Sequence, residues 1–522
     1  MRAFLVLGGL SLLGLFVGLG RLDWVDERES RDAWIARDLW VRRELLTPSL
    51  GGVPRFEKPL LAYLPEAASG ALTPRSPVGP RAFKAALAVG LVLLTGVIGA
   101  RWLGPRAGAL GGAVLATSLV LPLAARTDGT QLLATSLGWL GWAGLAAATL
   151  GEGRPRFLLP SYLALAAAAL VAGPFPALWP LGALLLHARW TPRADRPRIG
   201  AIAGLVLILG LSLPWYGAML ERHGTAFAWA VPSFPYGGDL GQPWYTAPAR
   251  ALGFLVVGFF PWSTLLPAAV LYRWTGVGVA DLQANPPTRL LIATLAAALI
   301  PLLFAPAAPL PAVLPALPAA ALLVGALLDR VFGGEALAGR ATAQASWLVA
   351  GSGTVAALLL AWIARRLGSA APELRLLATF LFVASWAPAL AAFLGRARAV
   401  PALIGCLVAF GTAVAALRTL PALSDYLSAA PVATAMNTVS VENAPLFLVE
   451  PPPASLRLRL ERRIALPARF APALSRARRT QAWVYVAFPP RRESEVARAA
   501  APAPLEILTR TPGLVLARIS GR

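Results

Sequence analysis

The chain is poor in cysteine, histidine, lysine and acid. Its one cysteine, Cys406, lies in an apolar segment, which excludes a disulfide framework and a cysteine-based metal site. His187 and His223 are the only histidines, so a histidine-rich metal centre is excluded as well. Lys58 and Lys84 are the only lysines, which makes arginine the usual cation of this chain. There are 25 acidic residues against 47 basic ones, a formal net charge of +22.

Charged residues make up only 14% of the 522 residues, whereas 57% are hydrophobic. Apolar runs of 18 or more residues recur from end to end, which predicts a polytopic α-helical membrane protein. Helices are favoured because hydrocarbon offers no partner for backbone N–H and C=O groups. The positive charge does not indicate nucleic-acid binding, since most arginines lie in short loops between apolar segments, where they set membrane topology.

Thirteen apolar segments are expected to form membrane helices. The first is Ala3–Gly20; a cleaved signal peptide is the rival interpretation, but the residues after it resemble a functional loop more than a mature terminus. The segments on either side of Gly173 and Pro174 could also form one broken helix. The other twelve are expected near residues 83–103, 107–124, 130–149, 157–172, 174–190, 199–219, 251–272, 288–306, 309–328, 342–364, 375–394 and 399–417.

An odd number of spans places the two termini on opposite sides of the membrane. With the N-terminus in the cytoplasm, the inside loops hold most of the loop arginines, as the positive-inside rule requires. The 21–80 loop, the 220–250 loop and the C-terminal tail then lie outside. The inside loops carry Arg106, Arg154, Arg156, Arg189, Arg193, Arg196, Arg198, Arg273, Arg289, Arg330, Arg340, Arg396 and Arg398.

The loop over residues 21–80 concentrates acids in an acid-poor chain. A helix over Ser30–Leu46 would place Ile35 and Leu39 on one apolar face and lie on the membrane surface, with tryptophans at headgroup depth. A solvated loop with a charged face is the alternative. The acids of this loop are Asp26, Glu27, Glu29, Asp32, Asp38, Glu44 and Glu57, with Asp23 just before them.

We expect a membrane domain over residues 1–420 and a second domain over residues 421–522, where the long apolar segments end. Short β-like runs over 445–449, 482–488 and 514–519 alternate with possible helices over 455–464 and 493–500. This pattern predicts a small α/β domain outside the membrane.

Several short motifs follow one another in a fixed order along the chain. The segment GVPRFEKPLLAY occupies residues 52–63, after Asp26-Glu27 and the ARDL of residues 36–39. ARTD over 125–128, PWY over 214–216 and FPWS over 260–263 follow. This ordered set resembles the GT-C polyprenyl-phosphate glycosyltransferases, nearest the lipid A aminoarabinose transferase and protein O-mannosyltransferase branch. The resemblance spans essentially the whole chain and implies about 13 membrane helices with a small outside domain.

The resemblance implies transfer of a sugar from a polyprenyl phosphate to a lipid, glycan or protein acceptor at the outer membrane face. Such an inverting displacement needs a carboxylate near the acceptor nucleophile, and positive charge at the departing phosphate. Asp26 is the candidate base or acceptor-orienting carboxylate, and Asp128 the second carboxylate. Glu57, with Asp26, is the candidate ligand of a divalent cation. The candidate substrate-binding residues are Arg31, Glu57, Lys58, Tyr63, Arg126, Trp215 and Tyr216.

Each of these residues also has a structural interpretation. Asp26 is also explained as a solvated loop acid, and Glu57–Lys58 as a surface ion pair of little energetic value. Asp128 suits the N-cap of the helix that begins near Thr130. The aromatic residues at 215 and 216 are typical of an interfacial belt at a helix end.

The chain departs from the family pattern where lipid phosphate is expected to bind. Aligned without a gap, the family's catalytic aspartate falls on Arg28; with two inserted residues it falls on Asp26. Ala172 and Ala308 stand where the family has lysines, and a histidine is missing near residues 240–243. A catalytically degenerate homologue that binds lipid-linked sugar or scaffolds envelope assembly is therefore the second hypothesis. A transporter is the weaker third, because transport sites tend to lie at the bilayer midplane.

Overall fold

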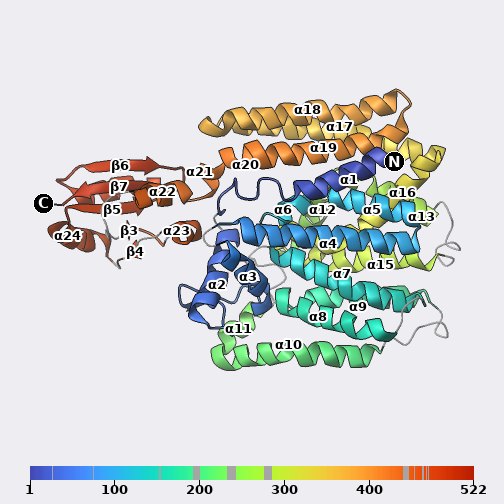
Figure 1. Cartoon of the computed structure of the whole chain (residues 1–522), viewed down its shortest axis with the longest axis horizontal. Coiled ribbons are helices and arrows are strands. Elements are labelled where there is room, and N and C mark those ends of the chain that lie inside the picture. The colour runs from blue at the N-terminus through green and yellow to red at the C-terminus, as the bar shows by residue number, and fades with distance from the viewer. Residues whose placement is uncertain are drawn as a thin grey trace.

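The computed structural model is mainly a bundle of long helices with a small β-sheet region at one end (Figure 1). Among the described residues, eight helices are long and apolar enough to cross a membrane. The N-terminus lies at the end of the bundle opposite the C-terminal sheet (Figure 1). The structure describes residues 1–25, 28–73, 76–127, 129–151, 155–191, 200–231, 243–275, 285–438, 446–451, 453–460, 464–465, 467 and 469–521.

All thirteen expected apolar segments contain helix, which confirms the polytopic helical prediction. The helices of the bundle are α1 (Arg2–Gly14), α4 (Val78–Trp102), α5 (Pro105–Ala116), α6 (Val120–Ala124), α7 (Gly129–Thr149), α8 (Leu158–Ala172), α9 (Phe175–Arg189), α10 (Ala201–His223), α12 (Ala247–Gly258), α13 (Leu266–Thr275), α15 (Pro286–Leu299), α16 (Leu317–Gly333), α17 (Ala336–Ala364), α18 (Ala371–Phe393) and α19 (Val400–Val414). Gly173, at φ 80°, separates α8 from α9, so this pair is two helices.

Two segments expected to be single helices are broken, and the two breaks lie against each other. The segment over 107–124 divides into α5 and α6, and the segment over 251–272 into α12 and α13. The indole N–H of Trp262 donates to the Thr117 hydroxyl at 2.9 Å, and the Leu119 N–H donates to the Phe260 carbonyl at 3.0 Å. Each break thus supplies partners for polar groups that the other leaves free, which apolar surroundings require.

Glycines bring α5 and α16 into close contact at the centre of the bundle. A Cβ added at Gly325 would lie 2.5 Å from the backbone N of Gly111, so Gly325 does not tolerate a side chain without movement of a backbone. Small residues at such crossings are typical of membrane helix packing. On its other sides α16 is buried among apolar side chains, as Leu322 and Leu328 illustrate.

Short elements after α1 and between α10 and α12 cover one end of the bundle: α2 (Arg28–Arg42), β1 (Ser49–Leu50), β2 (Val53–Pro54), η1 (Leu60–Ala62), α3 (Leu64–Leu72) and α11 (Thr225–Ala230). Helix α2 begins and ends earlier than expected, and α3 was not expected. The apolar face of α2 packs on the protein, because Ile35 and Leu39 are buried in a cluster with residues of α3, α7 and α8. The amphipathic helix is confirmed close to its expected bounds, its place at the membrane surface stays a prediction, and Trp40 is 63% exposed.

The C-terminal region forms a five-stranded mixed sheet in the order β4-β3-β5-β7-β6. Strands β3 and β5 are parallel, whereas β7 runs antiparallel to β5 and β6. Along β5, Val484 and Val486 face α24 and α25, while Tyr485 faces α22 and α23. The elements are α22 (Ala430–Thr438), β3 (Leu446–Leu448), α23 (Ala454–Arg459), β4 (Ile464–Ala465), α24 (Phe470–Thr480), β5 (Trp483–Phe488), α25 (Glu493–Ala500), β6 (Leu505–Arg510) and β7 (Val515–Ser520).

Helix α23 docks this sheet region on α2 and the linker before it. Leu458 packs with Trp24 and Ala33 in one apolar cluster. The guanidinium of Arg459 donates to Asp23 Oδ1 at 2.8 and 3.0 Å. This contact holds the C-terminal sheet beside the short helices where the ionisable residues gather.

Candidate active site

The two candidate catalytic carboxylates, Asp26 and Asp128, lie outside the described residues. Their flanking residues are described: Arg28 is the first residue of α2, and Gly129 the first of α7. Which of Asp26 and Arg28 stands at the position of the catalytic aspartate therefore stays a prediction.

Three buried ion pairs join α2, α3, α4 and the segment before η1 that carries Lys58. Glu29 pairs with Arg81 at 2.7 Å, Asp32 with Lys58 at 2.5 Å and Glu66 with Lys84 at 3.2 Å. All six side chains are less than a tenth exposed. Buried charges are found in such pairs because an uncompensated charge in an apolar surrounding is very unfavourable.

Arg81 organises the linker between α1 and α2. Its Nε and Nη2 each donate to a Glu29 carboxylate oxygen at 2.7 Å. Its guanidinium also donates to the carbonyls of Leu19 at 2.7 Å, Leu22 at 2.5 Å and Asp23 at 2.9 Å. The planar guanidinium of Arg81 thus holds the linker between α1 and α2 in place. Arginine suits this role because its N–H donors point in fixed directions.

Successive residues of α2 pair with successive residues of the GVPRFEKP segment. Arg31 donates to both carboxylate oxygens of Glu57 at 3.0 and 3.1 Å, and Lys58 donates to Asp32. Glu57 and Lys58 therefore do not form the surface pair that the sequence offered as the alternative. The Arg31–Glu57 pair is 40% and 30% exposed, whereas the Lys58–Asp32 pair is buried.

Tyr63 lies among these pairs with a free hydroxyl. The side chain is 1% exposed, and its oxygen has no hydrogen-bond partner among the described residues. Burial raises the pKa of Tyr63 well above its usual value of 10.0, and the nearby carboxylates of Asp32, Glu57 and Glu66 raise the pKa further. The phenol is therefore a neutral, unused donor at physiological pH.

The Arg126 guanidinium donates hydrogen bonds to backbone carbonyls of α6, of the last residue of α1 and of a residue just after α1. It donates to Pro122 at 3.2 Å, Gly14 at 3.1 Å and Val17 at 2.9 Å. Burial, and then the charge of Arg81, lower the pKa of Arg126 to about 10. The side chain links α1 to α6, and its hydrogen bonds go to backbone carbonyls.

Trp215 and Tyr216 belong to an aromatic cluster near the end of α10. The Trp215 indole donates to the Leu46 carbonyl at 3.1 Å, and the Tyr216 hydroxyl to the Ala169 carbonyl at 2.9 Å. Phe56 of the GVPRFEKP segment lies 5.0 Å from the His223 ring and 5.7 Å from the Phe227 ring. The rings thus pack α10 and α11 against the segment that carries Glu57 and Lys58.

The described residues do not form a metal site. Within them, no group of three or more His, Cys, Asp or Glu side chains is arranged to hold a metal ion. Of the two candidate ligands, Glu57 is described, and both its oxygens accept hydrogen bonds from Arg31.

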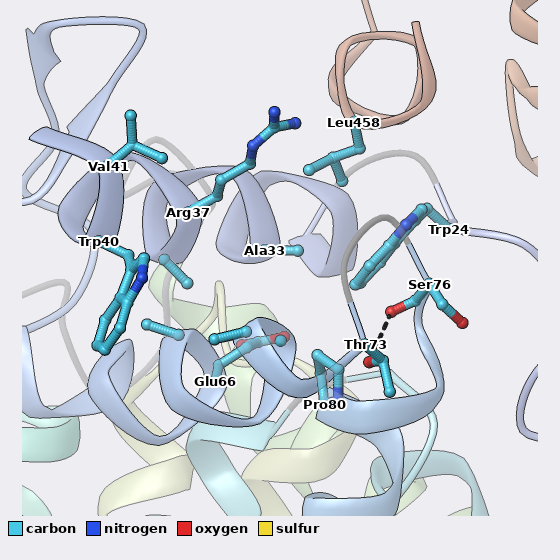
Figure 2. Close-up of a pocket in the computed structure, with 14 residues that line it drawn as sticks. Trp24, Ala33, Arg37, Trp40, Val41, Glu66, Thr73, Ser76, Pro80 and Leu458 are labelled. Atoms are coloured by element: carbon cyan, nitrogen blue, oxygen red, sulfur yellow. Dashed lines mark hydrogen bonds between the residues drawn. The ribbon is translucent and has the colours of Figure 1, made fainter. Parts of the chain in front are cut away.

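A cavity of about 570 Å³ opens between α2 and α3 beside α23 (Figure 2). Trp40 and Trp24 lie at opposite ends of the cavity, and Glu66 of α3 lines it (Figure 2). The buried indole N–H of Trp24 has no hydrogen-bond partner among the described residues. The cavity is thus lined by the indole rings of Trp24 and Trp40 and by the buried carboxylate of Glu66, which is paired with Lys84.

Two alanines stand at positions where the resemblance led us to expect lysines, and both are buried in apolar surroundings. Ala172 is 0% exposed beside the apolar face of α2, and Ala308 is 4% exposed in the core of the bundle. Sequence reasoning also missed Asp32, Glu66 and Lys84 as site residues. The rarity of lysine was the available signal, because both lysines of the chain are in this group of buried pairs.

No protein-family model matches the sequence, and no curated protein matches it. Two solved structures share its fold: ArnT from Cupriavidus metallidurans in the apo state, at 17% identity with a TM-score of 0.75, and the same protein bound to undecaprenyl phosphate, at 16% identity with a TM-score of 0.76. Each alignment covers 98% of this chain and 97% of that protein. The chain thus has the GT-C fold of ArnT over almost its whole length.

Proposed function

We propose that this chain is an integral-membrane glycosyltransferase that moves a sugar from a polyprenyl-phosphate donor to a lipid, glycan or protein acceptor. The observation that carries the proposal is the full-length similarity of its fold to ArnT bound to undecaprenyl phosphate. In this proposal the chain lies in the cytoplasmic membrane with its N-terminus inside. The arginine-rich loops support that orientation, which places α2, α3 and the C-terminal sheet on the outer side.

The departing lipid phosphate needs positive charge, and Arg31 is the more available cation. A donor phosphate has to compete with Glu57 for Arg31, in a half-exposed pair of small energetic value. Lys58 is buried with Asp32, so its release would leave a buried carboxylate without a partner. We therefore assign Arg31 to the first phosphate contact and Lys58 to a second.

Asp26 acts in this proposal as the base or orienting carboxylate for the acceptor, and Asp128 as the second carboxylate. The ring faces of Trp215 and Tyr216 pack on the sugar or the prenyl chain, because their polar atoms are already bonded to backbone carbonyls. Tyr63 offers a donor for which the described part of the chain provides no acceptor.

The second candidate is a homologue that binds lipid-linked sugar without turning it over. The observation in its favour is the replacement of two expected lysines by buried alanines, together with the pairing of Lys58 to Asp32. Each change reduces the free positive charge at the phosphate.

The test uses the full-length protein in lipid nanodiscs. Binding of undecaprenyl phosphate is measured against undecaprenol, which lacks the phosphate. Turnover is the release of undecaprenyl phosphate from undecaprenyl-phosphate-linked sugars when a bacterial envelope extract supplies the lipid, glycan or protein acceptor of the sugar. We expect phosphate-dependent binding that Arg31→Ala weakens about tenfold, the equivalent of about 1.4 kcal/mol. We expect turnover that Asp26→Asn and Asp128→Asn reduce at least about 100-fold with binding retained.

Phosphate-dependent binding with no turnover of any donor would favour the degenerate homologue. Equal affinity for the phosphate and the alcohol would contradict both candidates. Full activity in Asp26→Asn would remove Asp26 from the mechanism and leave the gapless register, in which Arg28 replaces the aspartate.

A further inference from the structure

Lys84 is a buried cation that the proposed chemistry does not use. It lies in the second turn of α4 and is 2% exposed. Its Nζ is 3.2 Å from Glu66 Oε1 and donates to the Thr127 carbonyl at 3.2 Å. These partners belong to α3 and to the turn after α6, so one ammonium group joins α4 to both.

The aliphatic part of Lys84 also contacts the residue that begins α7. A Cβ added at Gly129 would lie 2.8 Å from Cε of Lys84 and 3.2 Å from its Cδ, so the lysine chain packs directly against Gly129. Thr127 and Gly129 are the neighbours of Asp128 in the sequence. The chain on both sides of Asp128 is therefore held by a single side chain.

We propose that Lys84 is a positioning residue, which fixes Thr127 and Gly129, the two residues on either side of the candidate carboxylate Asp128. The inference rests on the proposed function, in which Asp128 is the second carboxylate. Lys84 acts through the Thr127 carbonyl and the contact with Gly129, and it does not touch the substrate.

The chemistry of lysine suits this task. An ammonium group has three donors on a flexible stem, so it can serve a carbonyl and a carboxylate that lie in different directions. Glu66 supplies the compensating charge that a buried ammonium requires. A misplacement of a reacting group by about 1 Å can reduce the rate about 100-fold, so small movements of this turn are sufficient to affect catalysis.

The first test is a kinetic comparison of Lys84→Met, Lys84→Arg and Thr95→Val in nanodiscs. Methionine keeps the length of the side chain and removes the ammonium, so we expect kcat for undecaprenyl phosphate release to fall about 100-fold with donor KM and undecaprenyl phosphate affinity unchanged. Arginine keeps the charge and the donors and should restore part of kcat. Thr95→Val is the matched control, because it removes a buried intrahelical hydrogen bond of 2.7 Å from the same helix, and it should leave kcat unchanged.

A double-mutant cycle tests the contact with Gly129. Gly129→Ala alone forces its methyl group against Lys84 and should reduce kcat. In the Lys84→Ala background the space is free, so the same change should have a much smaller effect. Additive losses would overturn the contact, because residues that do not interact give additive effects.

Hydrogen exchange of the amides in residues 129–133 provides a readout that needs no turnover. We expect faster exchange in Lys84→Met than in wild type or Thr95→Val. Unchanged exchange would overturn the inference, as would an unchanged kcat in Lys84→Met. A wild-type protein that neither binds undecaprenyl phosphate nor releases it would overturn the proposed function instead, and the exchange would still decide whether Lys84 orders the turn.

Discussion

Both lysines of this arginine-rich chain have a buried carboxylate as partner, Asp32 for Lys58 and Glu66 for Lys84. A lysine ammonium is compact and mobile, whereas an arginine guanidinium needs a planar arrangement of acceptors. The same helix carries both types: Arg81 has five acceptor contacts spread around its fork, and Lys84 has two partners on different elements. The choice between the two cations therefore follows the geometry of the acceptors at each position.

Tyr63→Phe tests the free hydroxyl at the residue scale. Removing a buried hydroxyl that has no partner among the described residues should leave the free energy of unfolding at pH 7 unchanged or raise it by up to about 1 kcal/mol. The pKa of Tyr63 is raised in the folded protein, so the folded state keeps a proton that the unfolded chain loses above pH 10.0. Wild type should therefore lose up to about 1.4 kcal/mol of stability per pH unit above that value, relative to the variant.

The measurement is the unfolding midpoint of both proteins in one detergent at pH 7, 10 and 11. A difference between wild type and Tyr63→Phe that does not change with pH would show that the phenol titrates in the folded protein as it does in the unfolded chain. A loss of several kcal/mol at pH 7 would mean that the hydroxyl has a partner.

At the scale of elements, the helices are held by two kinds of contact. Glycine contacts set the closest crossing, where Gly325 of α16 meets Gly111 of α5. Polar contacts connect places where helices end or break, as between Trp262 and Thr117. In an apolar solvent burial of apolar surface contributes little to helix association, so close packing and satisfied polar groups are left to determine the arrangement.

Gly325→Ala tests the crossing of α5 and α16. The new methyl group would lie 2.5 Å from the Gly111 nitrogen and 2.7 Å from the Ala107 carbonyl oxygen, so the helices have to separate. We expect a destabilisation of about 1–3 kcal/mol, typical of overpacking. The readout is the midpoint of thermal unfolding in detergent.

Gly351→Ala in α17 is the matched control, because a Cβ there has nothing within 4 Å. This change should be neutral or stabilise by about 0.5–1 kcal/mol, since alanine is the better helix former. Equal effects of the two substitutions would contradict the close approach at Gly325.

At the scale of the molecule, the C-terminal sheet is attached to the bundle by α23 on α2 beside the cavity (Figures 1 and 2). The attachment combines an apolar contact through Leu458 with the Asp23–Arg459 ion pair. Arg457 adds a contact over the Trp34 ring at 4.8 Å. Through Leu458, the docked helix α23 forms one wall of the cavity between α2 and α3.

Arg459→Ala should loosen the docking of the sheet region. Removal of a partly exposed pair is worth up to about 1 kcal/mol, which corresponds to about a fivefold change in the docking equilibrium. We expect faster hydrogen exchange in α23 and in the first turns of α2, with a difference from wild type that shrinks at high salt because screening weakens the wild-type pair.

Arg518→Ala is the control, since Arg518 pairs with Glu506 inside the sheet region at 2.7 Å. Its effect should be confined to the sheet, with exchange in α2 unchanged. Unchanged exchange in both α23 and α2 of Arg459→Ala would show that the apolar contact alone holds the docking.

Hydrophobic patterning was sufficient to predict the helical membrane class, the thirteen helical segments and three of the strands of the C-terminal sheet. Those features depend on local composition: an apolar run of sufficient length has few alternatives to a helix in a membrane. The motif order also pointed to the GT-C fold that the comparison with ArnT shows. The roles of Asp26 and Asp128 remain predictions.

The partners of each ionisable side chain were decided only by the tertiary structure. Neighbours in sequence suggested Glu57 with Lys58, but the fold pairs these residues with Arg31 and Asp32 on α2. The contact of Lys84 with Thr127 joins residues 43 positions apart. Composition constrains which residues leave water, but the crossing of helices determines which charges meet, because a buried charge takes the partner that packing places within reach.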